Sequence, residues 1–289
     1  MPELPEVESV VRALAPLLTG RSIKSVRVLN RSTLSGSPRQ PACLAGRRVE
    51  DVRRRGKYIY VALDEHMAML VHLRMTGWLG VKSAAQVAEE QDKFVRVVFE
   101  LGSHSPNAKS KEPGAKRREL LLFRDIRKFG RVWCGRREEL IALHSFNKLG
   151  PEPLAITAAA FTARLRARRG RLKSLLLDQK FLAGLGNIYA DEALFEAGLH
   201  PLAQAHRVKP ASAARLHAAI QKVLKRSIKA GGSSIGDYLH PDGTPGWFQR
   251  ELKAYGREGE PCARCPGTIK RLVVGQRGTW FCGKCQKKT

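Results

Sequence analysis

The chain begins with a proline that is followed closely by carboxylates, Pro2, Glu3 and Glu6. Removal of Met1 would free the secondary amine of Pro2, which can attack an electrophilic carbon and form an iminium, as lysines do in Schiff bases. A carboxyl group beside the amine could carry protons during such a reaction if its pKa suits the step. These residues therefore indicate a nucleophile with an acid–base partner, provided that Met1 is removed.

The same stretch also has the pattern of a helix start. Apolar residues recur at helical spacing over residues 7–18, Pro5 suits a first turn, and Gly20 ends the segment. Pro2 thus lies just ahead of a helix N-terminus, whose dipole disfavours an ammonium, whereas the nearby glutamates favour it. On its own, this stretch leaves plain helix initiation and covalent chemistry both open.

Four cysteines near the C-terminus have the spacing of a metal site. They form two Cys-x-x-Cys pairs, Cys262 with Cys265 and Cys282 with Cys285. Such pairs can close a tetrahedral thiolate cage around zinc, which leaves no position for a catalytic water, while redox dithiols are the alternative. The sequence predicts one structural Zn²⁺ ion. Between the pairs, residues 268–274 and 279–281 alternate like strands, and the turn between them displays Arg277.

The charge balance indicates a polyanionic partner. The chain carries 52 lysines and arginines against 26 acidic residues, a net charge of +26 over 289 residues. There is no long apolar run, signal-peptide pattern or basic amphipathic tail, so we expect a soluble cytoplasmic protein rather than a membrane protein. The isolated Cys43 and Cys134 do not resemble a secreted disulfide framework.

The elements that must position these residues fall into two kinds. After the first helix, short β-rich runs punctuated by glycine turns predict an antiparallel sandwich, over residues 23–28, 49–52, 58–63, 67–73, 94–101, 119–123 and 131–134. A polar stretch over residues 102–114 is rich in Ser, Pro, Gly and Lys and is predicted to be a mobile hairpin loop.

From about residue 158 the periodicity becomes helical. Helices are predicted over residues 158–168, 172–178, 188–197 and 210–229, after a boundary near Gly150-Pro151-Glu152-Pro153. Asn187 follows a glycine-rich turn, where it could cap a helix or contact a phosphate. The fold class is therefore α+β and multidomain, with predicted domains at residues 1–136, 153–240 and 256–289.

Taken together, these motifs resemble those of the bacterial formamidopyrimidine-DNA glycosylases, which remove oxidised purines from DNA. The resemblance covers nearly the whole chain and implies a helix with a β-sandwich, a helix-two-turns-helix domain and a zinc ribbon. It rests on residues 2–8, Gly56-Lys57-Tyr58, His72-Leu73-Arg74-Met75-Thr76-Gly77, Asp125-Ile126-Arg127-Lys128-Phe129-Gly130, Leu177-Asp178-Gln179, residues 184–192, and the ribbon with residues 275–279.

The resemblance implies a bifunctional DNA glycosylase and abasic-site lyase. Pro2 would attack the anomeric carbon of the damaged nucleotide, Glu3 would handle a proton at the sugar, and Glu6 would support them. Lys57 would contact phosphates and assist β-elimination, and Arg277 would assist δ-elimination. The partner implied is damaged double-stranded DNA, bound by a monomer.

The resemblance also implies residues that hold the bent duplex, because an enzyme that acts on a stacked base must first flip it out. Met75 would fill the vacated space, Arg127 would bond the orphaned cytosine, and Phe129 would form a wedge, although apolar residues beside strands are usually core residues. The predicted contacts to the DNA backbone come from Arg169 and Lys173, within a densely basic stretch, and from Asn187. Residues 231–234 would begin the loop that closes over the everted base.

Gln91 stands where many relatives carry a histidine that contacts DNA, so this contact departs from the family pattern. Two other classes of protein remain in view. A sister branch that prefers oxidised pyrimidines usually begins Pro-Glu-Gly-Pro, against which Leu4 argues. A non-enzymatic zinc-ribbon DNA-binding protein would need the charge and the ribbon but no free Pro2.

Overall fold

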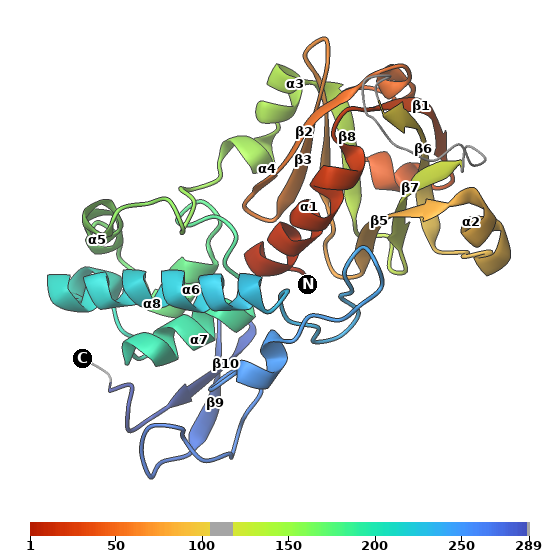
Figure 1. Cartoon of the computed structure of the whole chain (residues 1–289). Helices are drawn as coiled ribbons and strands as arrows, with labels where there is room; N and C mark the ends of the chain where they lie inside the picture. Colours follow the sequence, from red (N-terminus) through yellow and green to blue (C-terminus); the bar gives the residue numbers. More distant parts are fainter. Residues whose placement is uncertain (105–117, 288–289) are drawn as a thin grey trace. The chain divides into compact units, whose positions relative to one another are not determined.

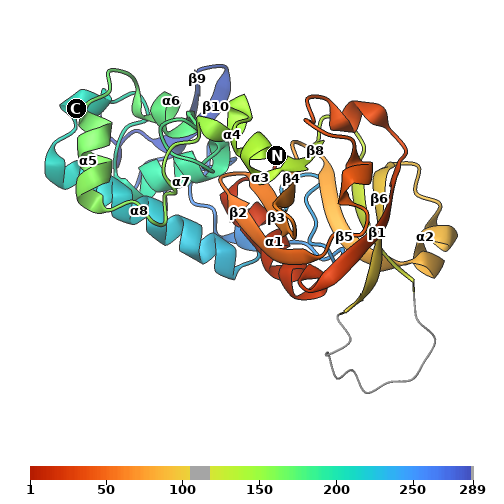
Figure 2. The same cartoon turned by 90° about the horizontal axis from the view of Figure 1, so that it is seen from above.

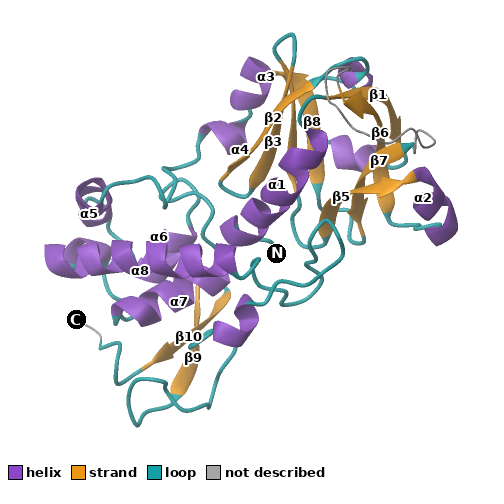
Figure 3. Cartoon of the chain, in the orientation of Figure 1, coloured by secondary structure: helices purple, strands orange, loops and turns teal. Residues whose placement is uncertain are grey.

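The computed structural model describes residues 1–104 and 118–287, which form two compact units, each assembled from separate parts of the chain. The sandwich unit comprises Met1–Pro2, Glu6–Asn147 and Ser233–Gly246. The helical unit comprises Glu3–Pro5, Lys148–Gly232 and Trp247–Thr289. Figure 3 shows that strands dominate the first unit, whereas helices and one hairpin make up the second.

The sandwich unit contains helix α1 (Leu4–Leu18), except for its first two residues, and two four-stranded antiparallel sheets (Figure 1). The order in one sheet is β1-β6-β7-β5, and in the other it is β2-β3-β4-β8. The strand bounds are β1 Arg21–Val28, β2 Val49–Arg55, β3 Tyr58–Leu63, β4 Met67–His72, β5 Gly77–Ser83, β6 Val95–His104, β7 Glu119–Asp125 and β8 Arg131–Arg136.

One apolar core joins the two sheets and α1. Ile23 and Phe99 of the first sheet belong to the same buried cluster as Val61 and Met69 of the second, together with a row of helical side chains. This row is Val7, Val10, Val11, Leu14 and Leu18, each of which has another member three or four residues away, so that they share one face of α1. Burial of each contributes about 2 kcal/mol. The apolar spacing that predicted the helix therefore also fixes which face meets the sheets.

Helix α2 (Ala84–Glu90) follows β5 directly and belongs to a smaller apolar cluster outside the main core. Val87 of α2 packs there against Val95, Val98 and Leu122. A complete capping box starts the helix, since Ser83 and Gln86 exchange side-chain to backbone bonds. Neither β5 nor α2 was predicted from the sequence. In Figure 2, α2 lies beside the sheet that contains β6 and β7.

Shorter elements complete the sandwich unit and lead out of it. They are the 3-10 helices η1 (Arg31–Leu34) and η2 (Pro41–Leu44), then α3 (Arg137–Ile141) and α4 (His144–Asn147). Phe146 of α4 packs edge-on against Tyr58 and stacks on Tyr60 of β3, with ring centroids 5.5 and 6.5 Å apart. Aromatic contacts of this kind anchor the end of the unit on its sheet.

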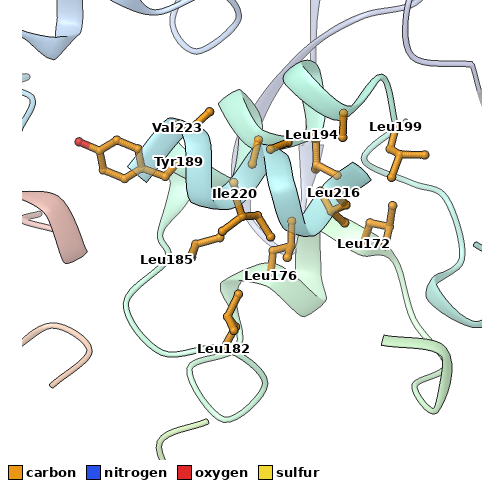
Figure 4. Packing of buried hydrophobic residues seen from close by; sticks show 14 of the residues in the cluster. Leu172, Leu176, Leu182, Leu185, Tyr189, Leu194, Leu199, Leu216, Ile220 and Val223 are labelled. Carbon is orange, nitrogen blue, oxygen red and sulfur yellow. The ribbon is translucent and has the colours of Figure 1, made fainter. Parts of the chain in front are cut away.

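The helical unit packs around α8. Its helices are α5 (Ala158–Arg166), α6 (Leu172–Leu177), α7 (Asn187–Ala197) and α8 (Pro210–Lys229), with η3 (Ala205–Arg207) and η4 (Phe248–Glu251) between and after them. Figures 1 and 2 both show α5 and α7 alongside α8, and their residues are in contact. The core contains Leu172 and Leu176 of α6, Tyr189 and Leu194 of α7, and Leu216, Ile220 and Val223 of α8 (Figure 4).

The C-terminal hairpin consists of β9 (Ile269–Val274) and β10 (Arg277–Cys282). Gly275 and Gln276 alone form the turn, and both have positive φ, +55° and +62°. Two consecutive left-handed residues define a type I′ turn, whose twist matches that of the strands. Arg277 is therefore the first residue of β10 rather than a residue of the turn, which corrects the position predicted from the sequence.

The predicted fold class is confirmed, and most predicted elements agree with the structure to within a few residues. Most of the polar stretch predicted as a mobile hairpin lies outside the described residues, but its first three residues, 102–104, belong to strand β6, so the predicted loop begins too early. The three domain boundaries stay a prediction. Cys43 and Cys134 form no disulfide, and burial raises the pKa of the Cys134 thiol.

Candidate active site and metal centre

The start of the chain is held in the helical unit by the glycine-rich turn before α7. Leu4 donates its backbone N–H to Gly184 O (3.0 Å), and Glu3, which is 3% exposed, accepts from Ile188 N at 3.1 Å. A Cβ on Gly186 would collide with Glu3 Cδ, so only glycine leaves room for this carboxylate. The turn Gly184-Leu185-Gly186-Asn187 therefore forms a binding position (the seat) that holds the side chain of Glu3, the residue after Pro2.

Within the sandwich unit, Glu6 is buried and holds the returning segment Ser233–Gly246. Its carboxylate accepts from Ser233 N at 2.7 Å, and its backbone carbonyl accepts from the hydroxyl of buried Tyr238 at 3.2 Å. Trp78 of β5 adds a third attachment, since its indole N–H donates to His240 O at 2.8 Å. The segment that follows Gly231 and Gly232, and that includes part of the predicted closing loop, is thus tied to α1 and β5.

Lys57 lies just before β3, in the turn that follows β2, and its side chain is nearly buried. Arg54 of β2 connects this turn to α1. Its Nε donates to Glu8 Oε2 at 2.9 Å, and its Nη1 donates to Gly56 O at 3.0 Å. Because the Arg54 side chain is only 9% exposed, this ion pair is shielded from solvent and fixes the turn relative to α1.

His72, at the end of β4, is a buried imidazole that sequence reasoning left without a role. Burial, together with the positive charges of Arg74 and Lys57, lowers the pKa of His72 to about 3. The ring nitrogen Nδ1 accepts the backbone N–H of Arg74 at 3.0 Å, so the neutral ring carries its proton on Nε2. The signal that could have found it is a histidine at the end of an apolar strand, two residues before an arginine.

Two loops in the sandwich unit present apolar side chains to solvent. Met75, between β4 and β5, is 40% exposed, and Phe129, between β7 and β8, is 48% exposed. Beside each lies a residue with a left-handed backbone, Arg74 with φ +54° and Lys128 with φ +58°. Arg127 places its guanidinium 4.9 Å from the centre of the Phe129 ring. The reading of Met75 and Phe129 as core residues is therefore wrong.

Gln91 lies elsewhere on the sandwich unit. It is exposed and ends α2 in the left-handed conformation, with φ +43°. The next residue, Asp92, forms an ion pair with Arg124 of β7. Gln91 thus belongs to α2 rather than to either loop that carries Met75 or Phe129.

Lys173 occupies a different place from the surface position that a phosphate contact would require. It is fully buried and donates to Asp191 Oδ1 at 2.6 Å and to Asn187 O at 3.0 Å. Burial lowers the pKa of Lys173 and raises that of Asp191, while their pairing opposes both shifts. Asp191 also accepts from Trp280 N at 3.2 Å, so the pair links α6, α7 and β10.

Asn187 begins α7, and the residue that caps the helix is Gly186, so the reading of Asn187 as the N-cap is wrong. Instead, Asn187 Nδ2 donates to Gly278 O at 2.9 Å and joins α7 to the hairpin. Arg277, next to Gly278, is exposed, and so is Arg169 before α6. The helical unit thus brings the seat of Glu3 and the start of β10 to the same end of α7.

The four C-terminal cysteines converge, with their sulfur atoms all within 4.8 Å of one another. Cys262 Sγ lies 3.7 Å from Cys285 Sγ, and Cys265 Sγ lies 3.6 Å from Cys282 Sγ. A tetrahedron of thiolates with Zn–S bonds of about 2.3 Å has edges of about 3.8 Å. The donors fit one zinc ion, which would hold β10 and the adjoining turns and would contribute no catalytic water.

A thiolate zinc ribbon on a helical unit, and a sandwich with exposed wedge-like loops, define a DNA-binding protein of the helix-two-turns-helix class. Three family models match: the formamidopyrimidine-DNA glycosylase N-terminal domain over residues 1–132, the H2TH domain over residues 149–238, and a zinc finger found in FPG and IleRS over residues 259–288.

Named relatives agree over the full length. The formamidopyrimidine-DNA glycosylase of Chloroflexus aurantiacus is 43% identical, over 99% of this chain and 98% of that protein. The Bacillus subtilis protein of the same name is 40% identical over the whole of both chains. This chain therefore belongs to the formamidopyrimidine-DNA glycosylase family, whose members are DNA glycosylases that act on damaged DNA.

Solved structures give the same result. The MutM (Fpg) protein from Thermus thermophilus is 37% identical, with a TM-score of 0.84 and complete coverage of both chains. The Lactococcus lactis Fpg, in complex with DNA containing an abasic site, is 32% identical, with a TM-score of 0.85 and coverage of 99% of this chain and all of that one. Among the described residues, no helix has the length and apolar character needed to cross a bilayer.

Proposed function

We propose that this protein excises oxidised purines, 8-oxoguanine and formamidopyrimidines, from duplex DNA and then cuts the strand by β,δ-elimination. The observation that carries the proposal is the fixed N-terminus. Glu3 and Glu6 are both buried and bonded to backbone N–H groups, one on α7 and the other on the returning segment. Two carboxylates held so firmly, one and four residues after a terminal proline, suit proton transfer better than they suit helix initiation alone.

In the proposed reaction, the Pro2 nitrogen bonds to the anomeric carbon while the bond to the damaged base breaks. The base leaves with the electron pair and takes up a proton. Glu3 transfers a proton at the sugar oxygen as the ring opens, and the product is an iminium between Pro2 and the deoxyribose. Glu6 supports the N-terminus through its bond to Ser233.

Elimination then breaks the two phosphate ester bonds of the bound sugar in turn. Lys57, held in its turn by Arg54, contacts phosphate and assists β-elimination, and Arg277 at the start of β10 assists δ-elimination. Met75, Arg127 and Phe129 enter the duplex at the lesion, where unstacking costs a few kcal/mol and inserted side chains offset that cost.

The remaining contacts are proposed for the DNA backbone. Exposed Arg169 and Gln91 would bind phosphates directly, and Asn187 would do so from the start of α7. Lys173 is buried, so we propose that it supports this surface by holding Asn187 and β10 in place. We also propose that the protein acts as a monomer in the bacterial cytoplasm.

Borohydride trapping on duplexes that contain 8-oxoguanine tests the proposal. Protein without Met1 should form a covalent adduct, because borohydride reduces the iminium to a stable amine. Pro2→Gly should form none, whereas Pro5→Ala, which changes a proline inside α1, should still form the adduct. Intact mass must show that Met1 has been removed. No adduct from correctly trimmed protein would exclude the proposed mechanism.

A further inference from the structure

One buried carboxylate joins the two exposed loops of the sandwich unit. Asp125, the last residue of β7, is completely buried. Its Oδ1 accepts from the hydroxyl of Thr76 at 2.5 Å and from Arg127 N at 3.2 Å, and its Oδ2 accepts from Gly130 N at 2.6 Å. One side chain thus bonds the end of the loop that carries Met75 and both ends of the loop that carries Phe129.

We call the bonded group of Asp125, Thr76, Arg127 and Gly130 the loop junction. Thr76 makes a second bond in this junction. Its hydroxyl oxygen also accepts the N–H of Arg127, at 3.1 Å, so this one N–H is shared between the hydroxyl and the carboxylate. Thr76 is 6% exposed, and water therefore does not compete for these bonds. The adjacent Gly77 pairs with Asp125 across β5 and β7. The junction is continuous with the sheet beneath it.

The surrounding residues leave the junction little freedom. A Cβ at Gly130 would lie 2.5 Å from the Phe123 ring and 3.0 Å from Asp125 Oδ2. Arg96 fixes the backbone of Asp125, since its Nε donates to Asp125 O at 2.8 Å. Left-handed residues such as Lys128 persist only when their surroundings hold them, and this junction supplies that restraint.

We propose that Asp125 and Thr76 are positioning residues that hold Arg127 and Phe129 in register and thereby set selectivity for the base opposite the lesion. This inference rests on the proposed function, in which Arg127 bonds the orphaned cytosine. Neither residue touches DNA in the proposal. Asp125 acts by fixing the backbone on both sides of Arg127, whose guanidinium lies over the Phe129 ring. Base reading requires a donor held in one place, because a displaced donor no longer distinguishes cytosine from adenine.

Single-turnover excision of 8-oxoguanine opposite cytosine and opposite adenine tests this proposal. Thr76→Val removes the hydroxyl with little change in shape, and Thr76→Ser keeps it. The ratio of the two excision rates should fall about tenfold in Thr76→Val, as expected for loss of one base-specific contact. Thr76→Ser should restore the ratio. Asp125→Asn should lower the ratio at least as much, because its amide cannot accept from both sides.

The control variant is Ser227→Ala, which removes a buried hydroxyl that bonds the Tyr189 hydroxyl at 2.6 Å in the helical unit. It should leave the ratio unchanged. If Asp125→Asn fails to fold, the Thr76 pair decides the question. An unchanged ratio in Thr76→Val, or an equal loss of rate opposite both bases, overturns the positioning proposal. If the wild-type protein excises nothing, the proposed function itself fails.

Discussion

At the scale of single residues, the candidate site is organised by polar side chains that are buried. His72 is an example, because its Nδ1 is occupied by the N–H of Arg74 and its charged form would face Arg74 and Lys57. Protonation would break that bond and add a positive charge to an already positive group. The folded protein therefore keeps this ring neutral under conditions in which the unfolded chain charges it.

The His72 environment predicts a specific acid sensitivity. The folded pKa of about 3 lies below the ordinary 6.5, so the stability that depends on the neutral ring is complete above pH 6.5 and is lost as pH falls toward 3. At pH 4 the loss from this group amounts to about 3 kcal/mol. Urea unfolding between pH 4 and 7 should show a shallower decline in His72→Gln than in the wild type.

His206→Gln is the matched control, since His206 is exposed in the helical unit. This variant should follow the wild-type pH profile. Parallel profiles for the wild type and His72→Gln would show that His72 is not the group responsible.

Residue types and spacing indicated Pro2, Glu3 and the four cysteines without any coordinates, and the family resemblance added Lys57. They could not indicate that Lys173 is buried, because a lysine in a basic run looks like a surface residue until its partner is known. That partner, Asp191, is eighteen residues away and is reached only once α6 and α7 pack together. Asp125 escaped notice for the same reason, since its bond to Thr76 spans two strands.

At the scale of elements, the hairpin and the metal centre depend on each other. Strand β10 begins with Arg277 and ends with Cys282, one of the four zinc-ligating cysteines. The position of Arg277 is therefore linked to zinc binding at Cys282. Phe195 of α7 packs on this centre together with Ile269 of β9. Glu192 of α7 also accepts backbone N–H groups from residues 253–255, which fixes the approach to the ribbon.

Loss of the zinc ion should therefore displace Arg277 from its position at the start of β10. Cys282→Ala is expected to lose the single zinc ion, as measured by native mass spectrometry, and to bind an abasic-site duplex at least about tenfold more weakly, because zinc binding supplies the folding free energy of such ribbons. Cys43→Ser should keep the zinc ion, since Cys43 lies in the sandwich unit. Full DNA affinity without zinc would contradict this link.

Elements with strong periodicity were predictable, and those that depend on their neighbours were not. Helix α8 agrees with its predicted bounds because Pro210 starts it and the apolar spacing continues through it. Strand β5 contains two glycines and begins at one, which in sequence resembles a turn. It becomes a strand because β7 pairs with it along its whole length.

At the scale of the whole molecule, the net charge of +26 predicts how binding responds to salt. Each phosphate that is neutralised releases a counterion and contributes about 0.9 to the slope of log affinity against log salt. Fluorescence anisotropy with an undamaged duplex should therefore show affinity falling by roughly a thousandfold between about 50 and 200 mM salt. Thermal melts at the same salt concentrations control for unfolding. A flat response would contradict an interface dominated by phosphate contacts.

The division of the chain into units was the feature least accessible from sequence. Periodicity and the segment Gly150-Pro151-Glu152-Pro153 marked the change from strands to helices, yet Ser233–Gly246 rejoins the sandwich unit after α8. Its attachments are Glu6 and Trp78, which lie 227 and 162 residues before their partners, and no local pattern connects them.

Because Ser233–Gly246 belongs to it, the sandwich unit is discontinuous in sequence. A truncated chain that stops at residue 147 keeps both sheets but loses Tyr238, a member of their apolar core, and leaves the carboxylate of Glu6 without the N–H of Ser233. Independent folding of the first half therefore requires a short stretch translated much later. The ribosome must have released α8 before the N-terminal unit can be completed.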